Sequence, residues 1–371
     1  MQSIPALLTT VSGVRITDVE GWETYRRDEI KTLFENYVYG VRDIERPADM
    51  TYTVTAENEV YGMRCKEITG GFGDFSFSFK LYLPKEQKGP LPAFVCVEHE
   101  NMENHLVFDG DGNMQWPEAD SGGTTVPLKD ITSRGYAAVF MPTRDLYRDW
   151  QFHAEYNQGI LAAARSPKGR NEHSWASISA WAWGVSRVVD YLETDPDVDA
   201  TKVASIGHSR SGKAALYAGA TDERILLTVP NNTGCMGAAI SRGKKGEHIK
   251  EINVSDWFCP KFKDYNDREE LLPVDQHMLL AMVAPRYLYI TDSIEDEWAD
   301  PDAEFLSARL ASEAYELYGL RGLVAPEKPV LHETYQEGRI AFHVKAGDHS
   351  QTKFDWDNVM NYFDKILAGE V

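Results

Sequence analysis

The hydrophobic pattern of the chain begins with one helical period and continues with several period-two runs. Apolar residues alternate almost strictly over 75–83 and more loosely over 50–60 and 63–68, as is typical of half-buried β-strands. Residues 20–39 have their apolar side chains at helical spacing, at positions Trp22, Tyr25, Ile30, Leu33, Phe34 and Tyr37. The pattern therefore predicts that residues 1–90 form an N-terminal cap helix and the antiparallel strands that open a mixed sheet.

From residue 91 onward, short apolar runs typical of buried strands alternate with helical patterns. Strands are expected at 91–98, 135–142, 203–206, 225–230, 287–291 and 340–345, and helices at 176–194, 212–219, 279–282, 305–318 and 356–367. Such alternation favours an α/β fold with a doubly wound, mainly parallel sheet and helices on both faces. Because the chain contains neither an internal repeat nor a low-complexity linker, we expect residues 1–371 to form a single domain.

The segment 203–219 is the strongest candidate for chemistry. An apolar strand leads into Gly207-His208-Ser209-Arg210-Ser211 and then into a helix of small residues, which is the strand–turn–helix context of the Gly-x-Ser-x-Gly nucleophile elbow of α/β-hydrolases. The second glycine of the motif is displaced by one position, to Gly212. The pattern alone also fits an ordinary strand–loop–helix crossover that happens to contain a serine.

A serine nucleophile needs a histidine base and a carboxylate that orients the imidazole. In an α/β-hydrolase the three follow in the order Ser, acid, His. His349 lies in the loop after the last predicted strand, where the base belongs. The loop after the preceding strand, 292–301, contains five carboxylates; we expect Asp296 to be the acid, with Glu295 as the second choice.

Two cations accompany the predicted nucleophile. The backbone N–H of Arg210, directly after Ser209, is a natural oxyanion donor, and its guanidinium could add charge-assisted hydrogen bonds. Lys213 lies one helical turn after Ser209, where the alternative is an ordinary surface charge. The pair suggests a substrate with negative charge or many hydroxyl groups.

A polar loop follows the early strand 91–98. Residues 99–105 of this loop are expected to supply oxyanion donors or pocket walls, as such loops do in hydrolase folds. The sequence Asp111-Gly112-Asn113 resembles a calcium loop only faintly, since the Asp-x-Asp-x-Asp-Gly ladder is missing. No metal site is therefore predicted there.

The charge balance of the chain is strongly acidic, since 38 Lys and Arg against 58 Asp and Glu give a formal net charge of −20. Such a field repels nucleic acids and anionic membranes, so neither is an expected partner. We expect a cytoplasmic protein, because the first residues lack the basic and apolar regions of a secretion signal. The four cysteines contain no Cys-x-x-Cys pair and are expected to be mostly buried free thiols, with Cys235 and Cys259 the one pair considered for a bridge.

Residues 207–213, which read Gly-His-Ser-Arg-Ser-Gly-Lys, resemble the glucuronoyl esterase family (carbohydrate esterase family fifteen). The likeness runs from about Ala93 to the end, in the family's order, through residues 218–220, 222–224, 230–234, 272–277, 284–286, 296–301 and the His349 loop. The first ninety residues match only loosely, in the manner of bacterial sequences often labelled acetyl xylan esterases.

This resemblance implies an α/β-hydrolase fold and cofactor-free, metal-free serine hydrolysis of esters of glucuronic acid or its 4-O-methyl ether through an acyl-enzyme. It implies that Ser209 is the nucleophile, His349 the base and Arg210 part of the oxyanion hole. It also implies that Lys213 contacts sugar hydroxyls and that Trp298 lines the uronate pocket. The substrate is then a small carbohydrate ester.

The chain departs from the family pattern at two places. Many members carry their acid as Glu in a segment that here reads Pro230-Asn231-Asn232-Thr233-Gly234, which favours Asp296 as the acid. Secreted fungal members have bridged cysteines where this chain has His208 and Ser350. Two other functions stay open: a carbohydrate deacetylase such as an acetyl xylan esterase, and an inactive carbohydrate-binding protein with a hydrolase fold.

Overall fold

A ten-stranded sheet organises the residues that the computed structural model describes, which are 4–98, 126–149, 158–253 and 256–371. Its strand order is β1-β2-β3-β5-β4-β6-β7-β8-β10-β9. The strands are β1 (Thr51–Val60), β2 (Met63–Phe72), β3 (Phe75–Pro84), β4 (Leu91–Glu98), β5 (Ala137–Pro142), β6 (Val198–His208), β7 (Ile225–Asn231), β8 (Tyr287–Ser293), β9 (Thr334–Tyr335) and β10 (Ile340–Lys345).

The sheet is antiparallel at its N-terminal edge and parallel through its centre. The strands β1, β2, β3 and β5 pair antiparallel, whereas β5, β4, β6, β7, β8 and β10 pair parallel. The short strand β9, which the hydrophobic pattern did not indicate, pairs antiparallel with β10. The predicted mixed, mainly parallel sheet is confirmed.

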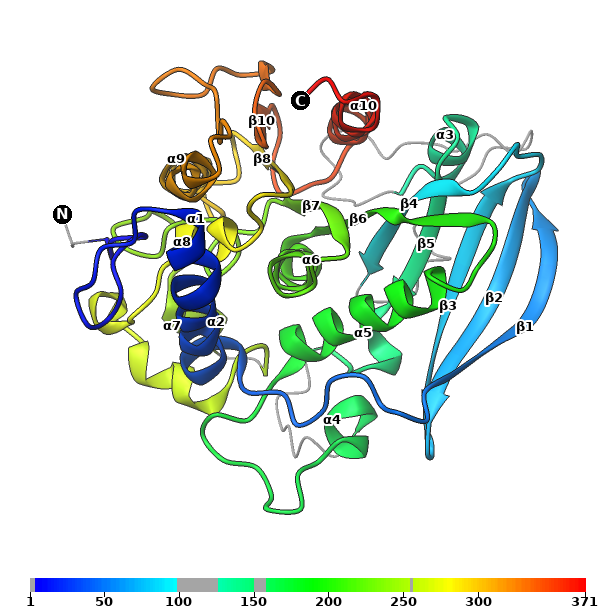
Figure 1. The fold of residues 1–371 in the computed structure, drawn as a ribbon, viewed down its shortest axis with the longest axis horizontal. Coiled ribbons are helices and arrows are strands. Elements are labelled where there is room, and N and C mark those ends of the chain that lie inside the picture. The colour runs from blue at the N-terminus through cyan, green and yellow to red at the C-terminus, as the bar shows by residue number, and fades with distance from the viewer. Residues whose placement is uncertain (1–3, 99–125, 150–157, 254–255) are drawn as a thin grey trace.

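Helices cover both faces of the sheet (Figure 1). One apolar core includes α5, α6, α8 and α9 on one face, and a second includes α3 and α10 on the other. The helices are α1 (Val19–Gly21), α2 (Arg27–Phe34), α3 (Leu128–Ser133), α4 (Gly159–Ala163), α5 (Ser177–Leu192), α6 (Ser209–Thr221), α7 (Ile249–Ile252), α8 (Gln276–Ala281), α9 (Pro301–Leu317) and α10 (Lys353–Ala368). Shorter π or 3-10 turns are η1 (Trp22–Arg26), η2 (Glu35–Tyr39), η4 (Thr143–Asp145), η5 (Pro260–Tyr265) and η6 (Glu269–Leu271).

The predicted N-terminal helix forms, but one of its apolar positions faces solvent. The segment is helical from Val19 to Tyr39 and interrupted by two π-helical turns, and α2 packs against α8. Trp22, Ile30 and Phe34 are fully buried, whereas Tyr25 is 66% exposed. The prediction for Tyr25 is wrong because a π-helical turn spans five residues and shifts the helical phase at that point.

All four cysteines are buried and free, so the considered bridge between Cys235 and Cys259 is wrong and the prediction of buried thiols is confirmed.

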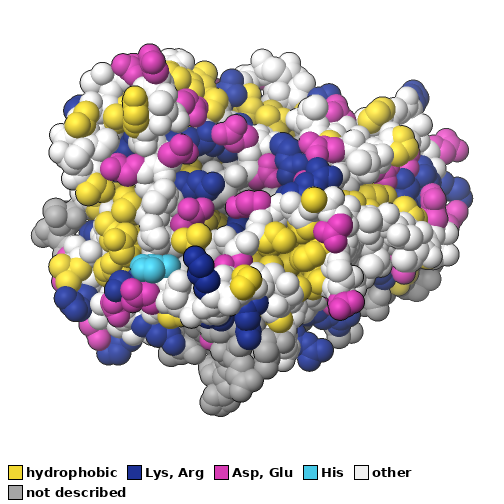
Figure 2. All heavy atoms as spheres, turned by 60° about the horizontal axis from the view of Figure 1, so that its bottom comes forward, with side chains coloured by type: hydrophobic (Ala, Val, Ile, Leu, Met, Phe, Trp, Pro, Cys, Tyr) yellow, Lys and Arg dark blue, Asp and Glu magenta, His cyan; other side chains and the backbone are white. Residues whose placement is uncertain are grey.

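On the face shown in Figure 2, acidic and basic side chains are intermingled, without one large basic area. Within the described ranges, no helix is both long and apolar enough to cross a bilayer.

Candidate functional site

Ser209 lies at the junction of β6 and α6, where the last residue of the strand is followed directly by the first residue of the helix. Its φ is +56°, in the left-handed region that a residue other than glycine occupies at a cost of about 1–3 kcal/mol. This backbone turns the half-buried serine side chain out of the strand direction. The structure thus forms the predicted strand–turn–helix of a nucleophile elbow.

The glycines on either side of Ser209 allow the turn to close. A Cβ on Gly207 would lie 2.5 Å from the carbonyl oxygen of Ser211, and a Cβ on Gly212 would lie 2.5 Å from Cγ2 of Thr233 and 2.6 Å from the carbonyl oxygen of Gly207. All three distances are too short for a side chain. The displaced glycine, Gly212, therefore stands at a point of backbone contact, and Ser211 does not need to be glycine.

His349 and Asp296, predicted as base and acid, are hydrogen-bonded to each other. Nδ1 of His349 lies 2.6 Å from Oδ2 of Asp296. Although burial opposes ionisation of Asp296, hydrogen bonds from His349 and Asn232 and the positive charge of His349 hold its pKa below the usual range. Glu295, the second choice for the acid, is exposed.

The imidazole of His349 packs against His208, the residue directly before Ser209. The ring centroids of His208 and His349 are 4.4 Å apart, and His208 itself is held by Asn231, whose Oδ1 lies 2.6 Å from His208 Nδ1. Because Nδ1 of His349 faces Asp296, its Nε2 is the ring nitrogen turned away from that carboxylate. This arrangement is compatible with a general base, which accepts a proton through Nε2.

Asn232 stands where the family resemblance would place a glutamate acid. Its Nδ2 donates to Oδ1 of Asp292 and to Oδ2 of Asp296, each at 2.9 Å. Its φ is +45°, which asparagine tolerates better than most side chains. The amide nitrogen thus holds two carboxyl groups in place, a role that sequence reasoning missed.

Two further buried carboxyls lie beneath Asp296. Oε1 of Glu304 accepts from the backbone N–H of Thr233 and of Gly234, at 2.9 and 2.7 Å. Burial outweighs these bonds and raises the pKa of Glu304 to about 7. Burial, together with the negative charges of Glu304 and Asp296, also raises the pKa of Asp292 well above its usual range. Burial thus favours the neutral forms of Asp292 and Glu304, whereas the hydrogen bonds to Asp296 favour its ionised form.

The two predicted cations are both paired with carboxylates. The Arg210 guanidinium forms an ion pair with Asp149, and Nζ of Lys213 lies 3.7 Å from Oε2 of Glu247. Both cations also lie over the Trp257 ring, at 5.7 Å for Cζ of Arg210 and 5.5 Å for Nζ of Lys213. Lys213 is only 3% exposed, so the alternative that it is a surface charge is wrong.

Trp298 is fixed beside this charged cluster. Its Nε1 donates to Oε1 of Glu247 at 3.1 Å, while 55% of the residue remains exposed. Its backbone carbonyl accepts from the buried Lys244 and from the N–H of Glu247, at 3.1 and 3.0 Å. A Cβ on Gly246, whose φ is +65°, would lie 2.7 Å from Cα of Trp298. Hydrogen bonds and close backbone packing therefore hold this loop, and Trp298 remains more than half exposed.

Asp149, Glu247 and Trp257 were missed because no strand or helix period marks the segments in which they lie. In the sequence, Asp149 precedes Trp150 and Trp257 follows Asp256, whereas Glu247 has no such neighbour. The predicted polar loop 99–105 and the segment Asp111–Asn113 lie outside the described residues. Within the described part of the chain, no group of three or more His, Cys, Asp and Glu side chains is arranged to hold a metal ion.

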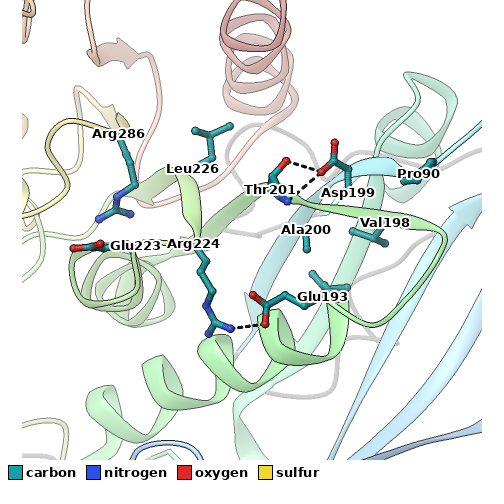
Figure 3. Close-up of a pocket in the computed structure, with 11 residues that line it drawn as sticks. Pro90, Glu193, Val198, Asp199, Ala200, Thr201, Glu223, Arg224, Leu226 and Arg286 are labelled. Atoms are coloured by element: carbon teal, nitrogen blue, oxygen red, sulfur yellow. Dashed lines mark hydrogen bonds and ion pairs between the residues drawn. The ribbon is translucent and has the colours of Figure 1, made fainter.

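A separate pocket of about 640 Å³ lies at the opposite end of the strands (Figure 3). It is lined by residues that begin β6 and β7, such as Val198 and Leu226, and by Arg224 and Arg286. Arg224 is already paired with Asp190, Glu193 and Asp222. Because α/β-hydrolase sites form at the carboxyl ends of the strands, this pocket is not the site of the serine chemistry.

The sheet topology, the strained Ser209 and the His349–Asp296 pair define an α/β-hydrolase. A family profile described as "Glucuronyl esterase, fungi" matches residues 170–319. Carbohydrate esterase MZ0003, from an unknown prokaryotic organism, is 34% identical over 99% of this chain and 90% of its own length. The 4-O-methyl-glucuronoyl methylesterase 1 of Wolfiporia cocos is 33% identical over 96% of this chain and 79% of its own.

Solved structures agree with these relatives. A glucuronoyl esterase from Solibacter usitatus superposes with a TM-score of 0.87 at 33% identity, and covers 98% of this chain and 97% of its own. The chain belongs to the glucuronoyl esterase family, carbohydrate esterase family 15. It is a carboxylic-ester hydrolase, and the predicted family, fold and enzyme class are confirmed.

Proposed function

We propose that this chain hydrolyses small carbohydrate esters of glucuronic acid or its 4-O-methyl ether, with Ser209 as the nucleophile, His349 as the base and Asp296 as the acid. The contact that carries the proposal is the 2.6 Å bond between His349 and Asp296 beside the elbow. The name of the Wolfiporia cocos relative, a 4-O-methyl-glucuronoyl methylesterase, supports a uronate ester as the substrate.

The reaction proceeds in two displacements. The Oγ of Ser209 attacks the ester carbonyl carbon as its proton passes to Nε2 of His349, and the resulting oxyanion is stabilised by the N–H of Arg210 at the start of α6. Collapse breaks the bond to the alcohol oxygen, which takes the proton from His349. Water then attacks the acyl-enzyme by the same steps, releasing the uronic acid and restoring the serine hydroxyl.

The charges around the elbow favour a neutral, hydroxyl-rich acyl group. Arg210 and Lys213 each have a carboxylate partner, Asp149 and Glu247, so the negative substrate that the two cations suggested is not required. A uronate ester is uncharged and offers hydroxyls that both an ammonium and a carboxylate can bind. The exposed ring of Trp298, held by Glu247, supplies an apolar surface for the face of a pyranose.

Kinetics with two substrates test this proposal. We expect hydrolysis of a benzyl glucuronate ester and at most slow release of acetate from an acetylated xylo-oligosaccharide. A fluorophosphonate probe should label the wild-type protein and leave Ser209→Ala unlabelled. Activity on the acetylated substrate alone would overturn the uronate assignment in favour of a deacetylase, and absence of both labelling and turnover would favour an inactive carbohydrate-binding protein.

A substitution of Glu247, which contacts Lys213 and Trp298, separates substrate binding from the chemical step. Glu247→Gln removes the counter-charge of Lys213 and weakens the acceptor for Trp298. We expect KM for the benzyl ester to rise by about ten-fold while kcat changes less. The reason is that the proposed contacts of Glu247, Lys213 and Trp298 with the sugar are made equally in the ground state and in the transition state. Glu297→Gln, an exposed neighbour of Trp298, is the matched control and should behave like the wild type.

A further inference from the structure

We propose that Lys345 is a positioning residue for the triad, which holds the acid loop and the histidine loop together through a buried hydrogen-bonded chain. This inference rests on the proposed function, because it assigns Lys345 a part in the work of Ser209, His349 and Asp296. Lys345 is the last residue of β10 and is only 2% exposed. A buried ammonium persists only where it is paired and hydrogen-bonded.

The ammonium of Lys345 joins the two loops that carry the acid and the base. Its Nζ donates to Oγ of Ser293 at 2.6 Å and to the backbone carbonyl of Ser350 at 2.8 Å. Ser293 ends β8 three residues before Asp296, and Ser350 directly follows His349. One side chain therefore fixes the start of the acid loop and the end of the histidine segment relative to each other.

The hydrogen bonds continue from Lys345 to the triad acid itself. Oγ of Ser293 accepts from Lys345 and donates to Oδ1 of Asn232 at 3.5 Å. Nδ2 of Asn232 donates in turn to Oδ2 of Asp296, which accepts from Nδ1 of His349. The donors and acceptors along this path have a consistent direction, its longest link is the 3.5 Å contact between Ser293 and Asn232, and it ends on the carboxylate oxygen that the imidazole uses.

The counter-charge of Lys345 is equally buried. Oδ2 of Asp355, at the start of α10, lies 3.1 Å from Nζ of Lys345, and the Asp355 side chain is 1% exposed. Burial opposes ionisation of Asp355, but the Lys345 charge and the hydrogen bond from His343 lower its pKa to about 2. Burial lowers the pKa of His343, which favours a neutral imidazole that donates from Nε2 to Asp355, at 2.9 Å.

A second buried ion pair elsewhere in the sheet makes it possible to separate a role of Lys345 in catalysis from a role in folding alone. A second buried ammonium, Lys66, is paired with Asp195 at 2.8 Å near the start of β2. Its ion pairs and hydrogen bonds to described residues are with Asp195 and Asp197, not with the proposed triad. Lys66 is 7% exposed. Lys66 is thus a matched control: it contributes a buried ion pair to stability without touching either catalytic loop.

The test compares Lys345→Met with Lys66→Met, by thermal unfolding, by kcat and KM on the benzyl glucuronate ester, and by the rate of fluorophosphonate labelling. Both variants should lower Tm, because each leaves a buried carboxylate unpaired. Only Lys345→Met should lower kcat and the labelling rate, by about ten- to hundred-fold with little change in KM, because small displacements of catalytic groups reduce the rate to this extent. Equal kcat values for the two variants, with an active wild type, would overturn the inference and leave the proposed function intact.

Two further variants keep the inference testable if Lys345→Met does not fold. The double variant Lys345→Met/Asp355→Asn removes the charges together, so Tm should recover while kcat stays low; recovery of kcat together with Tm would show a purely structural role. Ser293→Ala interrupts the chain to Asn232 and should lower kcat without a matching loss of Tm. A Ser293→Ala protein with wild-type kcat would count against the hydrogen-bonded path from Lys345 to Asp296. An inactive wild type would instead contradict the proposed function itself.

Discussion

Nδ2 of Asn232 and Nδ1 of His349 donate to the same oxygen, Oδ2 of Asp296, at 2.9 and 2.6 Å. The other oxygen, Oδ1, accepts from the backbone N–H of Ala299 at 3.1 Å. The carboxylate is therefore held at three points. Asn232, which stands where the family resemblance implies a glutamate, therefore stabilises the ionised form of Asp296, the proposed acid.

Replacing Asn232 should reduce turnover without removing any proposed triad member. For Asn232→Ala we expect kcat to fall by about ten-fold, since a hydrogen bond to a charged group contributes about 1.5–3 kcal/mol. Asn232→Asp should be worse, because it replaces a donor to Asp296 with another carboxyl group placed against Asp292 and Asp296. Steady-state kinetics on a benzyl glucuronate ester measure both, with Asn358→Ala in α10 as the control. Wild-type kcat for Asn232→Ala would show that Asp296 needs no such support.

The choice between Asp296 and Glu295 as the triad acid leads to a second prediction. Asp296→Asn should lower kcat by about 10⁴-fold, as a triad Asp changed to Asn does in a serine protease, because the amide favours the wrong imidazole tautomer. Glu295→Gln alters an exposed side chain and should leave kcat within about two-fold. The same ester assay decides, and a larger loss in Glu295→Gln than in Asp296→Asn would reverse the assignment.

The displaced glycine of the elbow leads to a third prediction. Gly212→Ala places a Cβ 2.5 Å from Thr233 and 2.6 Å from the carbonyl of Gly207, so the elbow must shift or the helix must move. We expect a loss of about 1–3 kcal/mol of stability, as in other overpacked sites, and slower labelling of Ser209 by the fluorophosphonate. Gly89→Ala, where nothing lies within 4 Å of the new Cβ, is the control. An unchanged Tm and labelling rate in Gly212→Ala would contradict the close packing.

Local periodicity predicted the parts of the fold that repeat along the chain. The alternating run at 75–83 became β3, the apolar run at 287–291 became β8, and the pattern at 176–194 became α5, all within a few residues. The strand–turn–helix at Ser209 and the pairing of His349 with Asp296 could also be predicted, because they depend on short motifs and on which strand precedes each loop. These features are local in sequence, so the residues themselves carry the signal.

The contacts that complete the site could not be predicted because they join segments far apart in sequence. Asp149 meets Arg210, and Glu247 meets Lys213, from irregular segments without periodicity. Lys345 gave one unused signal, since a lysine at the end of a strand that is otherwise buried requires a partner. That partner, Asp355, lies in the first turn of α10, and only the folded structure brings the two together.

The buried carboxyl of Glu304 leads to a prediction about the pH dependence of stability. Its pKa is raised to about 7 in the folded protein, against about 4.3 in an unfolded chain. Between these values the unfolded state has released the proton and the folded state has kept it, so the free energy of unfolding falls as pH rises, by up to about 1.4 kcal/mol per pH unit. The favourable contribution is complete below the unfolded value and is lost as pH rises through the folded one.

Glu304→Gln removes this titration and keeps an oxygen to accept from Thr233 and Gly234. We therefore expect the variant to gain stability relative to the wild type as pH rises from about 4.5 to 7, with no further change above that range. Urea unfolding at a series of pH values measures the difference, and Glu297→Gln, with an exposed side chain, should follow the wild-type curve. A constant difference between Glu304→Gln and wild type across this range would mean that Glu304 is ionised in the folded protein, and that Asp296 then lies beside a second buried negative charge.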